Sequence, residues 1–254
     1  MGVEINLRKL HLAIASFVTA ALAILVTAEP TARTPAGASL TNVSQHLSSV
    51  RVMAIGGSIA HGWDDTPSSG GYLARTFRSL SQNQTAYVFT NESSEGKGPS
   101  YYVTRMNALL AKDKPNLVVI SFGMLNDLFD HHPISEINQD VVVEVRDALA
   151  HDAQVVLVTP PVVGASYVEF KTQEGPTLTS EIRAVEALRN PNVHVVDLFS
   201  QMKTYLRVHH QTWEMYAADG WHPNAAGHAL AASILTADLK HDRWLNQTPI
   251  PPQA

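Results

Sequence analysis

The sequence contains no cysteine. This absence excludes disulfides, thiol nucleophiles and cysteine-ligated metal sites together. Only 16% of the residues are charged and no long basic run occurs, so nucleic acid is not an expected partner. The sequence also lacks internal repeats. Its 254 residues, 45% of them hydrophobic, suffice for one domain with a full-sized core.

The N-terminal segment indicates the compartment. Arg8 and Lys9 precede residues 10–28, a run without Asp, Glu, Lys or Arg that is rich in Ala, Leu, Ile and Val. This pattern is typical of a secretory signal. The run is nearly long enough to span a bilayer, so an uncleaved membrane anchor is the alternative. We therefore predict a secreted or membrane-anchored protein facing away from the cytoplasm, with a signal peptide or anchor at 1–28 and a linker at 29–49.

The rest of the chain alternates between apolar runs and segments with helical periodicity. Such alternation predicts an α/β fold, with a mostly parallel sheet and helices on both faces, over residues 50–245. A tail rich in Pro and Gln, 246–254, is expected to be disordered. The predicted strands lie near 50–55, 85–90, 116–122, 154–159 and 193–196. Helices are predicted at 72–80, 101–111, 134–150, 181–188 and 225–240, with a helix-containing insertion at 202–216.

The first predicted strand ends in Gly56-Gly57-Ser58. Glycines allow a sharp turn at the carboxyl edge of the sheet, where open α/β folds bind their ligands, and they leave a serine hydroxyl uncovered. We interpret Ser58 as a candidate nucleophile. An ordinary turn or a phosphate-binding loop would explain the same three residues. No Gly-x-Ser-x-Gly elbow surrounds Ser58, which argues against an α/β-hydrolase fold.

A candidate base for this serine lies before the last predicted helix. Histidine can remove a serine proton near neutral pH, and a carboxylate can orient the imidazole. Asp219 and His222 are three residues apart and would share one loop, because Pro223 disfavours helix at His222. The alternative is a helix-capping loop with an incidental histidine.

Acyl transfer also needs donors for a developing oxyanion. Two polar loops follow the second and third predicted strands and supply three candidates. Gly96 or Gly98 could offer a backbone N–H, and Asn126 could offer its side-chain amide. Each has a simpler explanation, since glycines often serve turns and Asn often caps a helix.

Several other residues could contribute but have structural explanations. The paired histidines lack a metal-site spacing, so solvent exposure is the preferred interpretation. A serine nucleophile with a histidine base needs no metal or organic cofactor, and none is expected. Asp197 ends a strand and could compete with Asp219, although a turn role is preferred. The remaining candidates are His61, His228, Trp63, Trp221, Tyr167 and Phe170, near the motifs or in an aromatic loop, and the paired histidines are 131–132 and 209–210.

Taken together, four blocks make the sequence resemble the SGNH (GDSL-like) hydrolase family over roughly 51–235. The blocks are residues 56–59 (GGSI), 91–96 (NESSEG), 123–127 (GMLND) and 219–224 (DGWHPN), followed by Gly227 and His228. The last block is the strongest match. Two departures stand out: Gly57 replaces the family's usual Asp, and the third block has one extra residue between Gly123 and Asn126.

The resemblance implies a flavodoxin-like, three-layer α/β/α fold with a parallel five-stranded sheet, and hydrolysis of esters. It implies that Ser58 attacks, His222 is the base and Asp219 orients it. The oxyanion hole would comprise the N–H groups of Ser58 and Gly96 and the amide of Asn126. A small-molecule or glycan ester is the expected substrate. A carbohydrate O-acetyl esterase and a non-catalytic protein that binds glycan or lipid are the alternatives.

Overall fold

The computed structural model describes residues 48–81, 85–241 and 244–247. Contacts between residues divide the chain into Met1–Val43 and Ser44–Ala254, and the first unit lies wholly outside the described residues. The expected signal segment 1–28 and nearly all of the expected linker 29–49 therefore also lie outside them. Among the described residues, no helix combines the length and the apolar character needed to cross a membrane.

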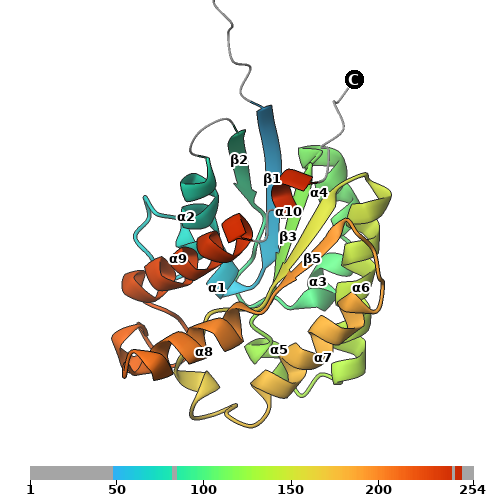
Figure 1. Cartoon of the computed structure of the whole chain (residues 1–254). Helices are drawn as coiled ribbons and strands as arrows, with labels where there is room; N and C mark the ends of the chain where they lie inside the picture. The colour runs from blue at the N-terminus through green and yellow to red at the C-terminus, as the bar shows by residue number, and fades with distance from the viewer. Residues whose placement is uncertain (1–47, 82–84, 242–243, 248–254) are drawn as a thin grey trace, which may run out of the picture. The chain divides into compact units, whose positions relative to one another are not determined.

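A parallel five-stranded sheet with the order β2-β1-β3-β4-β5 forms the centre of the second unit (Figure 1). Each predicted strand is present, and the first begins two residues before Val50. The strands β3 and β4 are buried along their whole length, as expected for parallel strands covered on both faces. The strands are β1 (Ser48–Gly56), β2 (Thr85–Asn91), β3 (Leu117–Ser121), β4 (Gln154–Val158) and β5 (Val193–Val196).

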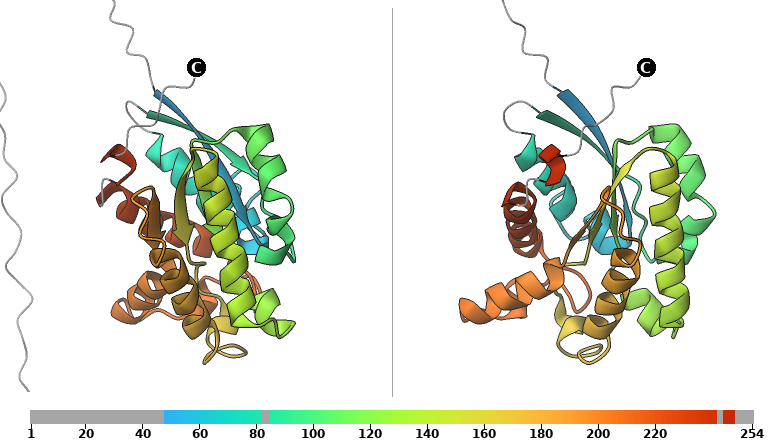
Figure 2. Two further views of the ribbon diagram at one scale, coloured as in Figure 1. Left: turned by 90° about the vertical axis from the view of Figure 1, so that its right-hand side faces the viewer. Right: turned by 45° about the vertical axis from the view of Figure 1, so that its right-hand side comes forward.

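Helices cover both faces of the sheet, which confirms the predicted three-layer α/β/α fold (Figure 2). On one face, α2 (Gly71–Leu80) packs against α9 (Ala225–His241). The opposite face carries α3 (Pro99–Val103), α4 (Met106–Asp113), α6 (Ile134–Ala150) and α7 (Glu174–Glu186). The remaining helices are α1 (Ser58–His61), α5 (Leu125–Phe129), α8 (Leu198–Val208) and α10 (Trp244–Gln247), with one-turn helices η1 (Gly164–Ser166) and η2 (Trp213–Met215).

Periodicity predicts α2, α6 and α9 closely, but several other boundaries were wrong. The single helix predicted over 101–111 is interrupted at residues 104–105, where the β-branched pair Val103-Thr104 disfavours helix. Helix α7 begins seven residues before the predicted Glu181, because Pro176 is tolerated within a first helical turn. Helix α8 begins at Leu198, four residues before the predicted start of the insertion, and α5 was not predicted at all. Helix α10 reaches Gln247, two residues into the expected tail.

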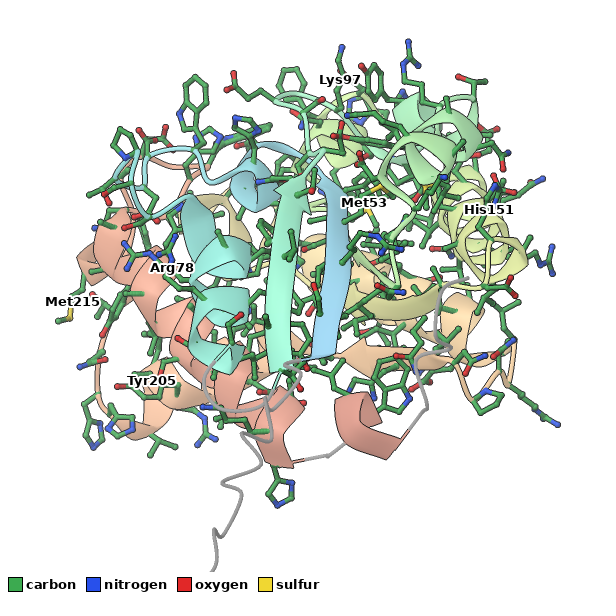
Figure 3. All side chains as sticks on the ribbon, turned by 90° about the horizontal axis from the view of Figure 1, so that it is seen from above. Met53, Arg78, Lys97, His151, Tyr205 and Met215 are labelled. Atoms are coloured by element: carbon green, nitrogen blue, oxygen red, sulfur yellow. The ribbon has the colours of Figure 1, made fainter. Side chains whose placement is uncertain are left out.

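All five strands run in the same direction, so their carboxyl ends meet at one edge of the sheet. Figure 3 shows Lys97 at the edge toward which β1 and β2 point, and Met53 beside β1 on the side of α4 and α6. The side chain of Met53 is completely buried. The loops that follow the strands are therefore fixed to a rigid core and gather at the edge where Ser58 lies.

The close approach of β1 to β3 at Gly56 makes this glycine a sensitive position. A Cβ on Gly56 would overlap the Ser121 carbonyl oxygen and lie 2.6 Å from the Ala60 Cβ. We expect Gly56→Ala to lower the free energy of unfolding by about 3 kcal/mol, because neither backbone can yield without disturbing the sheet. Gly175→Ala is the control, since its Cβ would meet only Phe199 at 3.7 Å, and should change stability by less than about 1 kcal/mol. Urea unfolding of both variants checks the prediction, and equal stabilities would contradict it.

Candidate active site

Ser58 is the first residue of α1, directly after the turn that ends β1. The turn residue Gly57 has an extended backbone, and a Cβ there would lie 3.1 Å from the carbonyl oxygen of Lys97. The glycine therefore lets the loop after β2 pass close to the serine. Ser58 is partly exposed, so its hydroxyl is accessible at the sheet edge.

The structure brings Ser58, His222 and Asp219 into one hydrogen-bonded series. The Nε2 atom of His222 lies 3.0 Å from Ser58 Oγ. The Nδ1 atom of the same ring lies 3.0 Å from Asp219 Oδ2 and 3.2 Å from Oδ1. A carboxylate can only accept, so the proton of a neutral His222 belongs on Nδ1. Nε2 is then free to accept the serine proton.

Backbone geometry stabilises the carboxylate of Asp219 in its charged form. The backbone N–H groups of Trp221 and His222 donate to Oδ1 at 2.6 and 2.7 Å. Burial alone would raise the pKa of Asp219, but the hydrogen bonds from the His222 side chain and from these two N–H groups outweigh it. The pKa of Asp219 therefore lies below its ordinary value, and the group is ionised near neutral pH.

The loop that carries Asp219 and His222 is shaped by the start of α9. Asn224 accepts a hydrogen bond from the N–H of Gly227 at 2.9 Å, which caps the helix as the sequence indicates. The Asn224 amide also donates to the carbonyls of Met215 and Ala217, at 3.2 and 3.1 Å. These contacts attach both ends of the loop to one side chain and present His222 toward Ser58.

A small cavity of about 20 Å³ lies beside Ser58. Asn126, on α5, lines it together with Ser58, Lys97 and Trp221. A volume of this size has room for roughly one water-sized group. The extra residue of the third block is accommodated by Met124, a buried non-glycine residue with left-handed φ of 57°. That conformation lets the chain turn into α5 and keeps Asn126 at the cavity.

The two candidate glycines after β2 have different surroundings. Gly96 has a left-handed φ of 66°, and a Cβ there would meet nothing within 4 Å. A Cβ on Gly98 would lie 2.5 Å from both carboxylate oxygens of Asp127. Packing against Asp127 thus explains a glycine at position 98. Gly96 itself does not line the cavity, but its neighbour Lys97 does.

Several other candidates from the sequence have partners outside the series formed by Ser58, His222 and Asp219. The carboxylate of Asp197 caps α8 through the N–H of Ser200, so it does not orient His222. The side chain of His61 contacts the carbonyl oxygen of Ser93, and Tyr167 lies under the ammonium of Lys203. Phe170 is buried and contacts the ring of Trp221 edge-on. All four histidines of the pairs 131–132 and 209–210 are exposed.

Aromatic side chains from three segments gather around the loop that carries Asp219 and His222. The ring of Trp63 lies 5.8 Å from that of His222. Trp221 contacts Phe129 edge-on at 5.9 Å and donates its indole N–H to Glu169 at 2.9 Å. Trp63 and Phe129 are 41% and 60% exposed, which leaves apolar surface beside this loop. The sequence suggested Trp63 and Trp221, but Phe129 was missed because α5 was not predicted.

One group of potential metal ligands occurs among the described residues. It comprises Asp64, Asp219 and His222, whose ligand atoms lie within 4.8 Å of one another. Both ring nitrogens of His222 already have partners in Asp219 and Ser58. Holding an ion there would therefore require His222 to give up one of these contacts.

The family model for the GDSL-like lipase/acylhydrolase family matches residues 54–230. The chain belongs to this family. The matched region runs from β1 through the start of α9, and it contains every residue of the site described above. A curated relative is the esterase TesA of Pseudomonas aeruginosa, 30% identical over 136 residues. That alignment covers 52% of this chain and 66% of the relative.

Solved structures of other proteins share the fold. EstA, an esterase from Pseudoalteromonas sp., superposes with a TM-score of 0.58 at 19% identity, covering 78% of this chain and 99% of that one. Axe2, an acetylxylan esterase from Geobacillus stearothermophilus, superposes with a TM-score of 0.63 at 17% identity, covering 82% and 100%. At these identities the likeness establishes the GDSL-family fold, and the chemistry has to be argued from the residues of this chain.

Proposed function

We propose that the protein is a serine esterase or acylhydrolase that cleaves carboxylic esters through an acyl-enzyme on Ser58. The observation that carries the proposal is the series from Ser58 Oγ through the His222 ring to the Asp219 carboxylate. Ser58 attacks the ester carbonyl while His222 takes its proton, and Asp219 orients the ring and balances its positive charge. His222 then protonates the leaving alcohol and activates a water that releases the acid. No step requires a metal or an organic cofactor.

The oxyanion formed by the attack needs donors on the side away from His222. We assign this role to the N–H groups of Ser58 and Gly96 and to the side-chain amide of Asn126. The cavity lined by Ser58 and Asn126 supports these two donors, because its size suits one carbonyl oxygen. Gly96 is preferred to Gly98 from the spacing of the second block, and packing against Asp127 accounts for the glycine at position 98.

An ester on a carbohydrate is the second candidate substrate. Trp63 and Phe129 leave ring surface exposed around the loop that carries His222, and the carboxylate of Glu169 accepts a hydrogen bond from Trp221 of the same loop. Flat apolar faces beside polar groups suit a sugar ring as the alcohol part. Axe2 is named for activity on acetylated xylan. We therefore propose a carbohydrate O-acetyl esterase as the alternative to a small-molecule or lipid esterase.

Hydrolysis of an ester panel tests the proposed function. Acetyl, butyryl and octanoyl esters of p-nitrophenol, and acetylated xylan, would be incubated with the wild type and with Ser58→Ala. We expect release by the wild type and only the buffer rate with Ser58→Ala. Acetate release from xylan that exceeds cleavage of the octanoyl ester would favour the carbohydrate alternative. Equal rates for both proteins on every ester would overturn the proposal.

A non-catalytic protein on the same fold, binding glycan or lipid, is the competing hypothesis from a different class. The contact between Ser58 and His222 speaks against it, because a binding protein has no need of an activated serine. A fluorophosphonate probe separates the two. Stoichiometric labelling at Ser58 supports the hydrolase, and an unlabelled protein supports the binding role.

We also propose that the protein is exported from the cytoplasm. This proposal rests on the charged and apolar pattern of residues 1–28, which also leaves attachment to a membrane through residues 10–28 as an alternative. Fractionation of cells that express the full chain, with mass measurement of the mature N-terminus, distinguishes cleavage from anchoring. Full-length protein in the cytoplasmic fraction would contradict export.

A further inference from the structure

His228 is a buried histidine and the fourth residue of α9, the helix that follows the Asp219–His222 loop. Its side chain is completely inaccessible to solvent, yet both ring nitrogens have partners. Nε2 lies 2.8 Å from the carbonyl oxygen of Trp63, and Nδ1 lies 3.2 Å from the backbone nitrogen of Tyr72. The ring therefore connects α9 to the segment after Ser58 and to the first turn of α2.

These two partners determine the protonation state of the ring. The carbonyl of Trp63 can only accept, so Nε2 must carry a proton. The N–H of Tyr72 can only donate, so Nδ1 must be unprotonated. His228 thus satisfies both contacts only as the neutral Nε2–H tautomer. An imidazolium would face the Tyr72 N–H with a second donor.

Trp63, the residue that His228 holds, contacts both halves of the candidate site. Its backbone N–H donates to the carbonyl oxygen of Ser58 at 3.1 Å, and its indole ring lies 5.8 Å from the ring of His222. The carbonyl that accepts from His228 belongs to the same residue. A shift of Trp63 would therefore change the placement of the nucleophile turn relative to the histidine.

We propose that His228 is a positioning residue for ester hydrolysis, which holds Trp63 so that Ser58 and His222 keep their hydrogen-bonding geometry. This inference rests on the proposed function of Ser58 and His222. A displacement of about 1 Å in a reacting pair can lower a rate by about 10²-fold, so a residue outside the hydrogen-bonded series can affect turnover strongly.

The surrounding charges are consistent with a neutral ring. Burial lowers the pKa of His228, while the contact with the Trp63 carbonyl and the carboxylates of Asp65 and Asp64 oppose that effect, and the Arg75 guanidinium adds to it. The carboxylate of Asp65 is itself paired with Arg75 through two hydrogen bonds of 2.7 and 2.8 Å. The pKa of His228 lies below its ordinary value, so the ring is neutral at pH 7.

Three substitutions of His228 distinguish its contact with Trp63 from its contact with Tyr72. A Gln amide nitrogen can take the place of Nε2 and donate to Trp63, an Asn oxygen can take the place of Nδ1 and accept from Tyr72, and Ala can do neither. We expect kcat for a short acyl ester to fall about 10-fold to 10²-fold in His228→Ala and His228→Asn, with KM changed less than about twofold. His228→Gln should retain kcat within about threefold of the wild type. Thermal unfolding of each variant shows whether a loss of kcat is only a loss of fold.

Any one of three results would overturn the inference. The first is a wild-type kcat in His228→Ala. The second is a loss of kcat in His228→Gln as large as in His228→Ala at equal stability, and the third is a wild-type kcat in His228→Asn together with a loss in His228→Gln. If the variants do not fold, ¹⁵N resonances of His228 in the wild type decide, because an Nδ1–H tautomer or an imidazolium at pH 7 contradicts the required contacts. A wild type without esterase activity counts against the proposed function, whereas an active wild type with insensitive variants counts only against His228.

Discussion

Alanine at Ser58, at His222 or at both is expected to lower kcat for a short acyl ester by about the same factor, on the order of 10⁴ or more. The two side chains take part in one proton transfer across a 3.0 Å contact, so the second substitution removes little that the first has left. Steady-state kinetics of the two single variants and the double variant measure this. The residual rate would report what the donors around the oxyanion supply alone.

His151→Ala is the matched control for this experiment. His151 is exposed at the end of α6, and its ring contacts only the backbone carbonyl oxygen of Asp147 among the described residues. Replacing His151 should leave kcat within about twofold, because its ring takes part in none of the hydrogen bonds around Ser58. Multiplicative losses in the Ser58 and His222 double variant would show that the two residues act independently. That result would contradict the shared proton transfer.

Asn at Asp219 should have the second largest effect, lowering kcat by about 10²-fold to 10⁴-fold. An amide can donate to Nδ1 of His222, and that contact would stabilise the tautomer whose proton lies on Nε2, facing Ser58. Such a ring cannot accept the serine proton. Asp219→Ala removes the orienting contact without this bias, so we expect a loss that is equal or smaller. Measuring kcat of both variants with the same ester gives the comparison.

Asp197→Asn tests whether the effect is specific to Asp219. Asp197 follows β5 directly and caps α8, and it accepts from Ser200 and Thr159 and not from His222. Its replacement should change stability by less than about 0.5 kcal/mol, because Asn caps a helix about as well as Asp, and should leave kcat within about threefold. If the Asp197 variant were as inactive as the Asp219 variants, our assignment of the orienting role to Asp219 would be contradicted.

Asp219 is also suited to its role over a wide pH range. Its pKa lies below the ordinary value, because the hydrogen bonds from His222 and two backbone N–H groups outweigh the opposing effect of burial. The carboxylate therefore stays ionised from weakly acidic to alkaline pH. Loss of activity on mild acidification would therefore not be due to protonation of Asp219.

The sequence by itself determined the fold class and the positions of the strands along the chain. Each strand is a short apolar run bounded by turn residues, and α6 and α9 show helical periodicity, so local pattern suffices for them. It also indicated Ser58, Asp219 and His222, since a glycine turn after a strand and an Asp-x-x-His-Pro loop have local signatures. Helix α5 had none, because it is a single short turn whose start depends on the left-handed backbone of Met124.

Only the tertiary structure decided which residues meet. Ser58 and His222 are 164 positions apart and lie 3.0 Å from each other because parallel strands end at one edge. The same packing buries His228 between α9 and α2 and joins it to Trp63, 165 positions away. A lone histidine in a helix gives no sign of such contacts. Hydrogen bonds between distant segments depend on how helices pack on the sheet, and residue spacing along the chain does not encode that packing.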